Sequence, residues 1–318
     1  MKPSTGKAVV VYNASAGRGQ GQAIAARSAQ FLTRAGWRVI TPVATPACAK
    51  DRSALVSRLA ARVGCLVVVG GDGTLREVCA ALQACGHRVA LGLIPIGNAN
   101  VMARELDIPL DPSEAMQLLT NGRPLAVDAA LMIPTDRDTG PVLFMAMLEI
   151  GFGAAVIHRV HQWRRHAWRR VYRCWGDLLY FPAIIGSLME SQRPAFRARI
   201  DSQEPLVGCR QAVIANTSTY ARGWTMTPQA RPHDGLLDFM GRRGDTPAAL
   251  VQSYANAWRG RETRTDDVHY RQGRRMIIEA ERPLRLQADG DPLPPQTRLR
   301  IEVRPKAIQF MVPAGFKR

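Results

Sequence analysis

Two short segments of the chain place a carboxylate beside glycine in a way that suits phosphate chemistry. Residues 70–74 read Gly-Gly-Asp-Gly-Thr directly after an apolar run, and residues 289–291 read Asp-Gly-Asp near the C-terminus. Glycines let backbone N–H groups approach a phosphate closely, and a helix entered at Thr74 would add its positive N-terminal end. We therefore expect an anion at residues 70–74.

The two carboxylates suggest different tasks in phosphoryl transfer. Asp72 would repel a phosphate unless it holds Mg²⁺ or takes a proton from the attacking hydroxyl. Asp289 could accept the proton of an alcohol, which is a poor nucleophile until a base removes that proton. On residue types alone, simpler readings stay open: Asp72 could cap a helix after a Gly-rich turn, and Asp289-Gly290 could be an ordinary hairpin turn.

Two further loops follow apolar runs and open helical patterns. Residues 13–21 read Asn-Ala-Ser-Ala-Gly-Arg-Gly-Gln-Gly and lack the lysine and the Ser/Thr pair of a Walker A loop. Taken alone, this segment could equally well bind a phosphate or be a plain turn from a strand into a helix. The third loop, residues 95–100, reads Pro-Ile-Gly-Asn-Ala-Asn. Three such loops at the carboxyl ends of strands would line one crevice.

The elements that must position these loops alternate between strand and helix up to about residue 127. Apolar strands are expected at residues 8–12, 37–43, 65–69 and 89–94, and helices at residues 20–35, 52–63 and 74–85. A glycine follows each helix as a left-handed cap: Gly36, Gly64 and Gly86. This pattern predicts a mostly parallel sheet that is covered on both faces.

After residue 127 the pattern changes to strands separated by Gly, Pro and Asp turns. The expected strands are residues 142–150, 196–200, 211–216, 236–239, 276–280 and 284–288. Helical inserts are expected at residues 161–189 and 247–258. We therefore expect a first α/β domain over residues 1–127 and a mainly antiparallel domain over residues 128–305. The C-terminal segment, 306–318, contains a strand at 308–312 that could return to the first domain.

Composition limits the class of protein. The 318 residues include 46% hydrophobic and 22% charged residues without a long biased tract, which is typical of folded globular domains. There is no uncharged apolar run of about 18 residues, and the five apolar residues before Asn13 are too few for a secretory signal. We expect a cytoplasmic protein that does not span a membrane. The six cysteines form no Cys-x-x-Cys pair, so neither zinc nor a disulfide framework is indicated.

The chain is strongly basic, with 43 basic and 26 acidic residues and a formal net charge of +17. This excess favours an anionic partner: nucleotide phosphate, nucleic acid or an acidic membrane surface. Residues 159–179 combine apolar and aromatic stripes at helical spacing with six arginines: Arg159, Arg164, Arg165, Arg169, Arg170 and Arg173. Such a helix suits the headgroup boundary of an anionic bilayer, but a helix packed on its own domain with a solvated basic rim fits almost as well. Nucleic-acid binding is not expected, because no recognised nucleic-acid module accompanies the charge.

Taken in order, these segments resemble the diacylglycerol kinase catalytic-domain superfamily, which includes sphingosine kinases and bacterial lipid kinases. Residues 70–77 match its Gly-Gly-Asp-Gly-Thr-x-x-Glu signature, residues 97–104 match its Gly-Thr-x-Asn segment, and residues 289–291 match a late Asp-Gly-Glu. Residues 13–19 match an opening Asn-Pro-x-Ser/Ala-Gly-x-Gly, and residues 228–238 match a Pro-x-Ala and Asp-Gly-x-Leu-Asp stretch. NAD kinases and phosphofructokinase-like folds share the first signature, but the ordered set is specific.

The resemblance implies transfer of the γ-phosphate of ATP to a lipid hydroxyl. The nucleotide cleft would lie between a Rossmann-like, phosphofructokinase-like domain and a β-rich domain that accepts the lipid. Asp289 would be the catalytic base, with Asp72 as the second catalytic carboxylate and Mg²⁺ as the metal. The nucleotide contacts carried over are Asn13, Thr45, Gly70, Gly71, Asp72, Gly73, Thr74, Glu77, Gly97, Asn98 and Asn100.

The resemblance also implies a secondary Mg²⁺ site. This site would use the Asp234 carboxylate and the backbone carbonyls of Arg231 and Leu236. Diacylglycerol, a sphingoid base and other lipid alcohols all stay open as acceptors, and the sequence is silent on the oligomeric state. The alternatives are an NAD-kinase-like enzyme that acts on a soluble acceptor, and an inactive relative that only binds nucleotide or lipid.

Four positions differ from the usual residues of this superfamily. Asn98 replaces threonine, Arg76 replaces a common asparagine and Asp291 replaces glutamate, so that all three positions stay polar. Val101 stands where many members have aspartate, which removes a carboxylate that could belong to a metal network.

Overall fold

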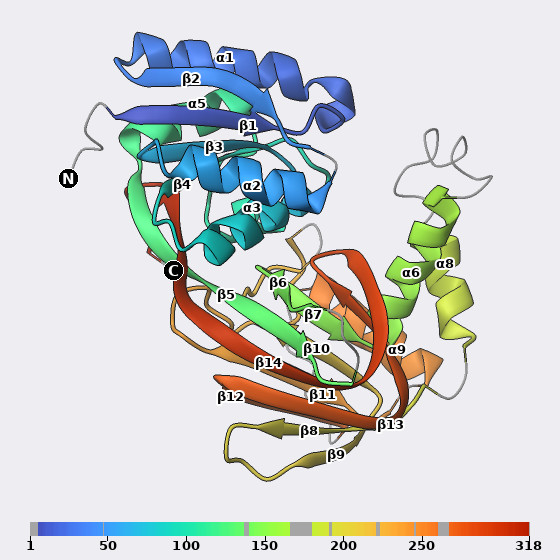
Figure 1. Ribbon diagram of the computed structural model, residues 1–318. Coiled ribbons are helices and arrows are strands. Elements are labelled where there is room, and N and C mark those ends of the chain that lie inside the picture. The colour runs from blue at the N-terminus through green and yellow to red at the C-terminus, as the bar shows by residue number, and fades with distance from the viewer. Residues whose placement is uncertain are drawn as a thin grey trace.

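The protein consists of two domains that share one sheet. A computed structural model of the chain describes residues 6–46, 48–136, 140–165, 180–190, 193–220, 223–244, 246–259 and 267–317. The strands of these residues form a 14-stranded sheet that runs from the first domain into the second (Figure 1).

Four parallel strands form the centre of the first domain. They are β1 (Lys7–Tyr12), β2 (Arg38–Ala44), β3 (Cys65–Gly70) and β4 (Ala90–Pro95). Their spatial order is β4-β3-β1-β2, and each neighbouring pair is parallel. Every residue of β3 is buried, as is usual for a strand covered on both faces. The expected mostly parallel sheet is therefore confirmed.

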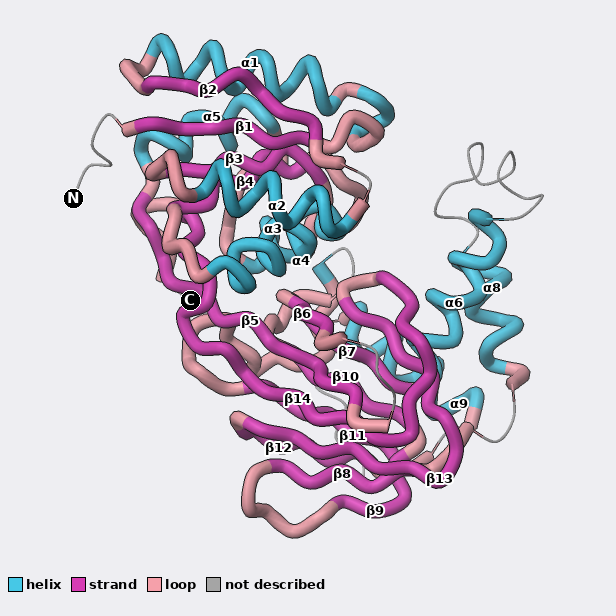
Figure 2. Tube along the Cα trace, in the orientation of Figure 1, coloured by secondary structure: helices cyan, strands magenta, loops and turns pink. Residues whose placement is uncertain are grey.

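Helices cover both faces of these strands (Figure 2). A 3₁₀ turn, η1 (Gly17–Gly19), precedes five helices: α1 (Gly21–Arg34), α2 (Ala49–Ala60), α3 (Asp72–Cys85), α4 (Val101–Glu105) and α5 (Pro112–Asn121). Helix α1 contacts α5 and helix α2 contacts α3, so each pair lies on its own face of the sheet. Because the strands are parallel, the loops that follow them begin at the same edge.

The second domain is mainly antiparallel, as expected. Its strands are β5 (Arg123–Pro134), β6 (Val142–Phe144), β7 (Met147–Ile150), β8 (Phe196–Ile200), β9 (Leu206–Cys209), β10 (Gln211–Ala215), β11 (Leu237–Arg242), β12 (Val268–Gly273), β13 (Arg275–Ala288) and β14 (Asp291–Val312). Its helices are α6 (Phe152–Arg165), α8 (Tyr180–Leu188) and α9 (Pro247–Trp258). Helices α6 and α8 form an arm that stands beside the sheet (Figure 1).

The strands β5 and β14 connect the two domains. Strand β14 pairs with β13 and β5 in antiparallel fashion and, at its far end, with β4 in parallel fashion. Gln309 and Phe310 lie opposite Ala90 and Leu91, so residues 308–312 lie beside the central strands of the first domain. Residue 127, where the sequence pattern changes, lies inside β5, a strand that the pattern did not predict.

Some element boundaries differ from the expectation, for identifiable reasons. Gly36 and Gly86 adopt the expected positive φ, at 87° and 68°, but Gly64 does not. Helix α2 ends earlier, at Ala60, and the Gly64 N–H instead donates to the Lys7 carbonyl, 2.9 Å away, where the chain enters β3. The single strand expected at residues 142–150 is two short strands, β6 and β7.

The long helix expected at residues 161–189 begins earlier, with α6, and residues 166–179 of the basic segment lie outside the described residues. Within the described part of the chain, no helix is both long and apolar enough to cross a membrane.

Candidate active site

Two glycine-containing loops of the first domain touch each other through their backbones. Gly71 caps α3 and lies against Gly97 in the loop between β4 and α4. A Cβ atom at Gly97 would lie 2.6 Å from the Gly71 Cα, and one at Gly70 would lie 2.7 Å from the Thr74 Cβ. At Gly73, in contrast, a Cβ would meet nothing within 4 Å. The glycines therefore allow tight packing of the two loops and leave open space at the start of α3.

Asn100 builds the loop between β4 and α4. Its backbone is left-handed, with φ of 48°, and its amide forms two hydrogen bonds with Gly97. The Gly97 N–H donates to Asn100 Oδ1 over 3.0 Å, and Asn100 Nδ2 donates to the Gly97 carbonyl over 2.9 Å. Asn100 thus holds the loop closed, while Asn98 lies exposed within it.

The loop after β1 reaches the start of α3. Asn13 Nδ2 donates to the Thr74 hydroxyl over 3.2 Å, and Asn13 Oδ1 accepts from the N–H and hydroxyl of Ser15. After β2, Thr45 donates its N–H and its hydroxyl to the Tyr12 carbonyl, at 2.8 and 3.2 Å. The structure therefore brings Asn13, Thr45 and both glycine loops to one edge of the sheet.

Asp289 occupies a two-residue hairpin loop between β13 and β14. Its φ of 48° and the φ of 86° at Gly290 are typical of the turn that Asp-Gly favours. The Asp289 carboxylate accepts three backbone N–H groups, from Met145 at 2.7 Å and from Ala146 and Met147 at 2.9 Å each. These bonds explain the break between β6 and β7, because N–H groups at the break point to the carboxylate.

The end of this hairpin rises from the second domain towards α3 and α4 (Figure 2). The pKa of Asp72 is raised to about 6: burial is the largest cause, the nearby charge of Asp289 also raises it, and the backbone N–H groups at the start of α4 lower it. The Met102 N–H lies 3.4 Å from Asp72 Oδ1. Burial also raises the pKa of Asp289, whereas its three N–H donors and Arg76 lower it. Two carboxylates from different domains thus lie within electrostatic reach, an arrangement that favours a cation between them.

Two of the residues that differ from the superfamily form an ion pair with each other. Arg76 Nη2 on α3 donates to Asp291 Oδ2 at the start of β14. The guanidinium therefore connects the two domains beside Asp72 and Asp289. Both residues differ from the usual ones of the superfamily. They lie 215 positions apart in the sequence, so their ion pair could not be predicted from it.

Glu77 forms an ion pair within the first domain. Its carboxylate lies 2.9 Å from Arg52 Nη1 of α2. Burial raises the pKa of Glu77, and Arg52 lowers it. Arg52 also donates to the Pro46 carbonyl over 2.9 Å. In the structure Glu77 thus anchors the loop between β2 and α2, next to Thr45.

The loop expected to form a secondary metal site lies beside β5 and β14. Asp234 is exposed, and its Oδ1 accepts from the Leu236 N–H at 2.9 Å. Arg231 turns its guanidinium to the Ala230 carbonyl. Asp128 of β5, which the sequence analysis did not predict, accepts from the Gly235 N–H at 2.7 Å. Burial is the main cause that raises the pKa of Asp128, and the charge of Asp234 raises this pKa as well. No cluster of three or more His, Cys, Asp or Glu side chains suited to a metal occurs among the described residues.

Glu105, also missed by the sequence reading, joins α4 to the second domain. It is fully buried, and its Oε2 accepts from the Thr219 N–H at 2.8 Å and from the Ser218 hydroxyl at 3.1 Å. The sequence contained one indication of this contact, because Glu105 is an acidic residue within the apolar helical pattern that follows the third loop.

Comparisons with known proteins agree with this architecture. Residues 7–132 match the diacylglycerol kinase catalytic domain, and residues 146–312 match the YegS C-terminal NAD kinase beta sandwich-like domain. A "Probable lipid kinase YegS-like" of Pseudomonas aeruginosa (strain UCBPP-PA14) is 30% identical over 258 residues, which cover 81% of this chain and 79% of that protein. A diacylglycerol kinase of Mycobacterium tuberculosis (strain ATCC 25618 / H37Rv) is 27% identical over 268 residues, covering 82% and 81%.

A solved structure shows the same fold over nearly the whole chain. The crystal structure of a diacylglycerol kinase from Bacillus anthracis str. Sterne superimposes with a TM-score of 0.73 at 18% identity and covers 98% of both chains. The resemblance drawn from the ordered motifs is therefore confirmed. The chain belongs to the diacylglycerol kinase catalytic-domain family, in the group whose C-terminal half is a YegS-type β-sandwich domain.

Proposed function

We propose that the protein transfers the γ-phosphate of ATP to the hydroxyl of a membrane lipid alcohol, such as diacylglycerol or a sphingoid base. The observation that carries this proposal is the placement of Asp72 and Asp289. They come from different domains, and the charge of Asp289 raises the pKa of Asp72. Membership of a kinase family supports phosphoryl transfer, and its relatives named lipid kinase support a lipid acceptor.

The carboxylate pair suits Mg²⁺. With a pKa of about 6, Asp72 is mostly ionised above about pH 6, and a divalent cation beside it would relieve the repulsion from Asp289. Carboxylate oxygen is the ligand type that Mg²⁺ prefers, so Asp72 would hold the metal. When bound, Mg²⁺ would neutralise the phosphate oxygens of the nucleotide.

The first domain would bind the nucleotide at the carboxyl ends of its strands. The phosphates would lie on the backbone N–H groups of residues 70–74, where the space at Gly73 is open. Thr45, Asn13 and the exposed Asn98 would contact the nucleotide around this loop. Glu77 and Asn100 would act by holding the neighbouring loops, since both side chains already have partners in the protein.

Asp289 would act as the general base. The three backbone N–H groups and Arg76 favour the ionised carboxylate, which can accept the proton of the acceptor hydroxyl. The Arg76–Asp291 ion pair would hold the hairpin against α3 while this happens.

The arm of α6 and α8 would place the protein on an anionic membrane. Three large apolar side chains of the α8 region are exposed: Phe181 by 68%, Ile185 by 45% and Met189 by 81%. Their spacing of four residues places them along one helical face. Together with the net charge of +17, this apolar face suits the surface of an anionic bilayer, where a lipid acceptor resides.

The loop at Asp234 would hold a second Mg²⁺, as the resemblance implies for Arg231, Asp234 and Leu236. The exposed Asp234 carboxylate and its electrostatic coupling to Asp128 support this proposal.

One assay tests the main proposal. Purified protein is incubated with γ-labelled ATP, Mg²⁺ and a total lipid extract, and the labelled product is identified by its mass. We expect label in the lipid fraction and its loss on chelation of the metal. Label in NAD without lipid would replace the proposal by the NAD-kinase-like alternative. Binding of Mg-ATP without transfer to either acceptor would indicate an inactive binding protein.

A further inference from the structure

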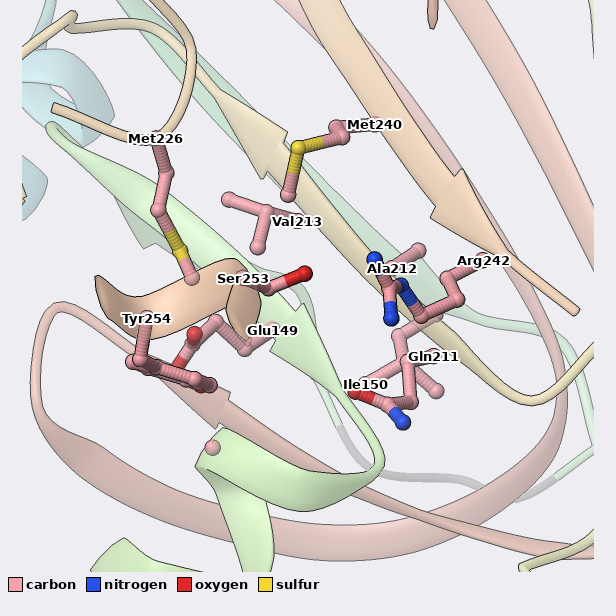
Figure 3. Close-up of a pocket in the computed structure, with 11 residues that line it drawn as sticks. Glu149, Ile150, Gln211, Ala212, Val213, Met226, Met240, Arg242, Ser253 and Tyr254 are labelled. Atoms are coloured by element: carbon pink, nitrogen blue, oxygen red, sulfur yellow. The ribbon is translucent and has the colours of Figure 1, made fainter. Parts of the chain in front are cut away.

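A buried carboxylate lies two residues beyond the strand residue that contacts Asp289. Glu149 on β7 is only 2% exposed, and it borders a pocket whose walls come from β7, β10, β11 and α9 (Figure 3). Val213, Met226, Met240 and Tyr254 line much of this pocket. Burial raises the pKa of Glu149, so an isolated carboxylate would be costly here. Hydrogen-bond partners must therefore stabilise the Glu149 carboxylate.

Glu149 is one member of a chain of hydrogen bonds that ends at the Asp289 turn. The Tyr220 hydroxyl donates to Glu149 Oε1 over 2.9 Å, and Gln287 Nε2 donates to Glu149 Oε2 over 2.5 Å. The other end of the amide, Gln287 Oε1, accepts from the Gly290 N–H at 2.8 Å. Glu149 and Gln287 lie directly opposite each other in the antiparallel pair of β7 and β13.

Two partners, the Glu149 carboxylate and the Gly290 N–H, determine which way the Gln287 amide points. An ionised carboxylate can only accept hydrogen bonds, so it must face the NH₂ group of Gln287. The amide oxygen then faces Gly290, whose N–H needs an acceptor. With the amide reversed, its NH₂ group would oppose the Gly290 N–H, and its oxygen would oppose the Glu149 carboxylate.

The orientation of the turn follows from this contact. Gly290 and Asp289 are the two residues of one tight loop, with φ values of 86° and 48°. Fixing the Gly290 N–H fixes the peptide plane that joins it to Asp289, and thereby the direction of the Asp289 side chain. Strand β7 therefore contacts the turn directly through Met147, whose N–H donates to the Asp289 carboxylate and whose carbonyl accepts from the Asp289 N–H over 3.0 Å, and indirectly through Glu149 and Gln287.

We propose that Glu149 and Gln287 are positioning residues, which orient the Asp289 carboxylate for proton transfer without touching the substrate. This inference rests on the proposed role of Asp289 as the base. It predicts that the pattern of donors and acceptors matters more than the presence of any one side chain.

The test compares single variants with an exchanged pair. Gln287→Met removes both hydrogen bonds, and Gln287→Glu sets two carboxylates against each other. The double variant Glu149→Gln with Gln287→Glu restores the pattern. The new amide can accept from Tyr220 and donate to the new carboxylate, which in turn can accept from the Gly290 N–H.

We expect both single variants to lower kcat about tenfold or more, with KM for ATP within about twofold, because only the base is misplaced. The exchanged pair should recover kcat to within about threefold of the wild type. Gln296→Met is the matched control, because Gln296 is a buried glutamine of the same hairpin, 1% exposed, and lies opposite Leu284 in the pair of β13 and β14, several residues from the turn. If the exchanged pair stays as impaired as Gln287→Met, or if Gln296→Met lowers kcat equally, the inference is wrong.

A second measurement is independent of catalysis. The N–H groups of Met145 and Ala146 donate to Asp289, so their hydrogen exchange reports its position. Exchange in this segment should accelerate about tenfold in Gln287→Met, and not in the exchanged pair. Unchanged exchange would overturn the positioning role even in an active enzyme. A wild-type protein that phosphorylates no lipid would instead contradict the proposed function, while the exchange result would still stand.

Discussion

At the scale of single residues, Asp289 is half-buried and, as the proposed base, has to carry a charge. Burial favours the protonated carboxyl group, and the three N–H donors with Arg76 favour the carboxylate. The hairpin turn and the proposed base are therefore one arrangement, because the tight Asp-Gly loop directs the Asp289 side chain to residues 145–147.

Replacement of Asp289 by asparagine should reduce phosphoryl transfer and leave ATP binding nearly unchanged. An amide cannot accept the proton of the acceptor, so phosphoryl transfer should fall by about 10²–10⁴-fold. ATP affinity should change by less than about threefold, because residues 70–74 are untouched. Transfer of label to lipid, together with ATP titration, measures both quantities. Undiminished transfer would exclude Asp289 as the base.

The Asp72 carboxylate should lower the free energy of unfolding at pH values at which it is ionised. Its pKa of about 6 in the folded protein lies above the ordinary value of 3.8, so the folded state holds the proton more tightly, and stability falls as the pH rises through this window. Asp72→Asn carries no such charge. In the absence of divalent metal it should therefore be more stable than the wild type above about pH 6, by about 1–2 kcal/mol, and equal to it below about pH 4.

Urea unfolding at pH 4 and pH 8 measures this difference, and transfer activity should be lost in the same variant. A variant that is less stable than the wild type at both pH values would contradict the assigned cause.

At the scale of elements, the contact between the loops after β3 and β4 depends on the absence of side chains. Gly97→Ala would place a Cβ 2.6 Å from the Gly71 Cα, so the loops must separate. We expect a loss of about 1–3 kcal/mol in the free energy of unfolding and weaker ATP binding. Gly64→Ala is the control, because a Cβ there meets nothing within 4 Å. Equal effects of both substitutions on ATP binding would contradict the role of the loop contact.

The exposed face of α8 should contribute to membrane binding. Replacing Phe181 and Ile185 by serine removes apolar surface that is exposed in the folded protein, so stability should change little. Binding to vesicles of anionic lipid should weaken about tenfold or more, since each buried apolar side chain contributes about 1.5–3 kcal/mol. Val207→Ser is the control, because Val207 is 57% exposed but lies on β9, away from the arm. Sedimentation with vesicles measures the difference, and equal binding of all variants would reject this docking face.

At the scale of the whole molecule, the two domains should unfold together. Strand β14 belongs to both, and its Phe310 is fully buried beside β4 and β5. Phe310→Ala should cost about 3–5 kcal/mol and move a single calorimetric transition to lower temperature. Lys317→Ala, near the C-terminus, should leave the transition unchanged. Two transitions, of which only one moves, would show that the domains unfold independently.

The sequence by itself determined the local features of this protein. Apolar runs and glycine spacing predicted the central strands, the loops after them and the antiparallel second half, because these depend on neighbouring residues. The order of the motifs identified the family. The predicted helix end at Gly64 was wrong, because a long-range hydrogen bond from the Gly64 N–H to the Lys7 carbonyl sets the conformation there, and no helix cap forms.

Only the tertiary structure decided which distant residues meet. The coupling of Asp72 with Asp289, the Arg76–Asp291 pair and the contact of Glu149 with Gln287 all join segments far apart in the chain. Each depends on the path of β13 and β14, which turn back beside β7 and continue to β4. Register and twist over the whole sheet set these distances, and no local pattern of residues records them.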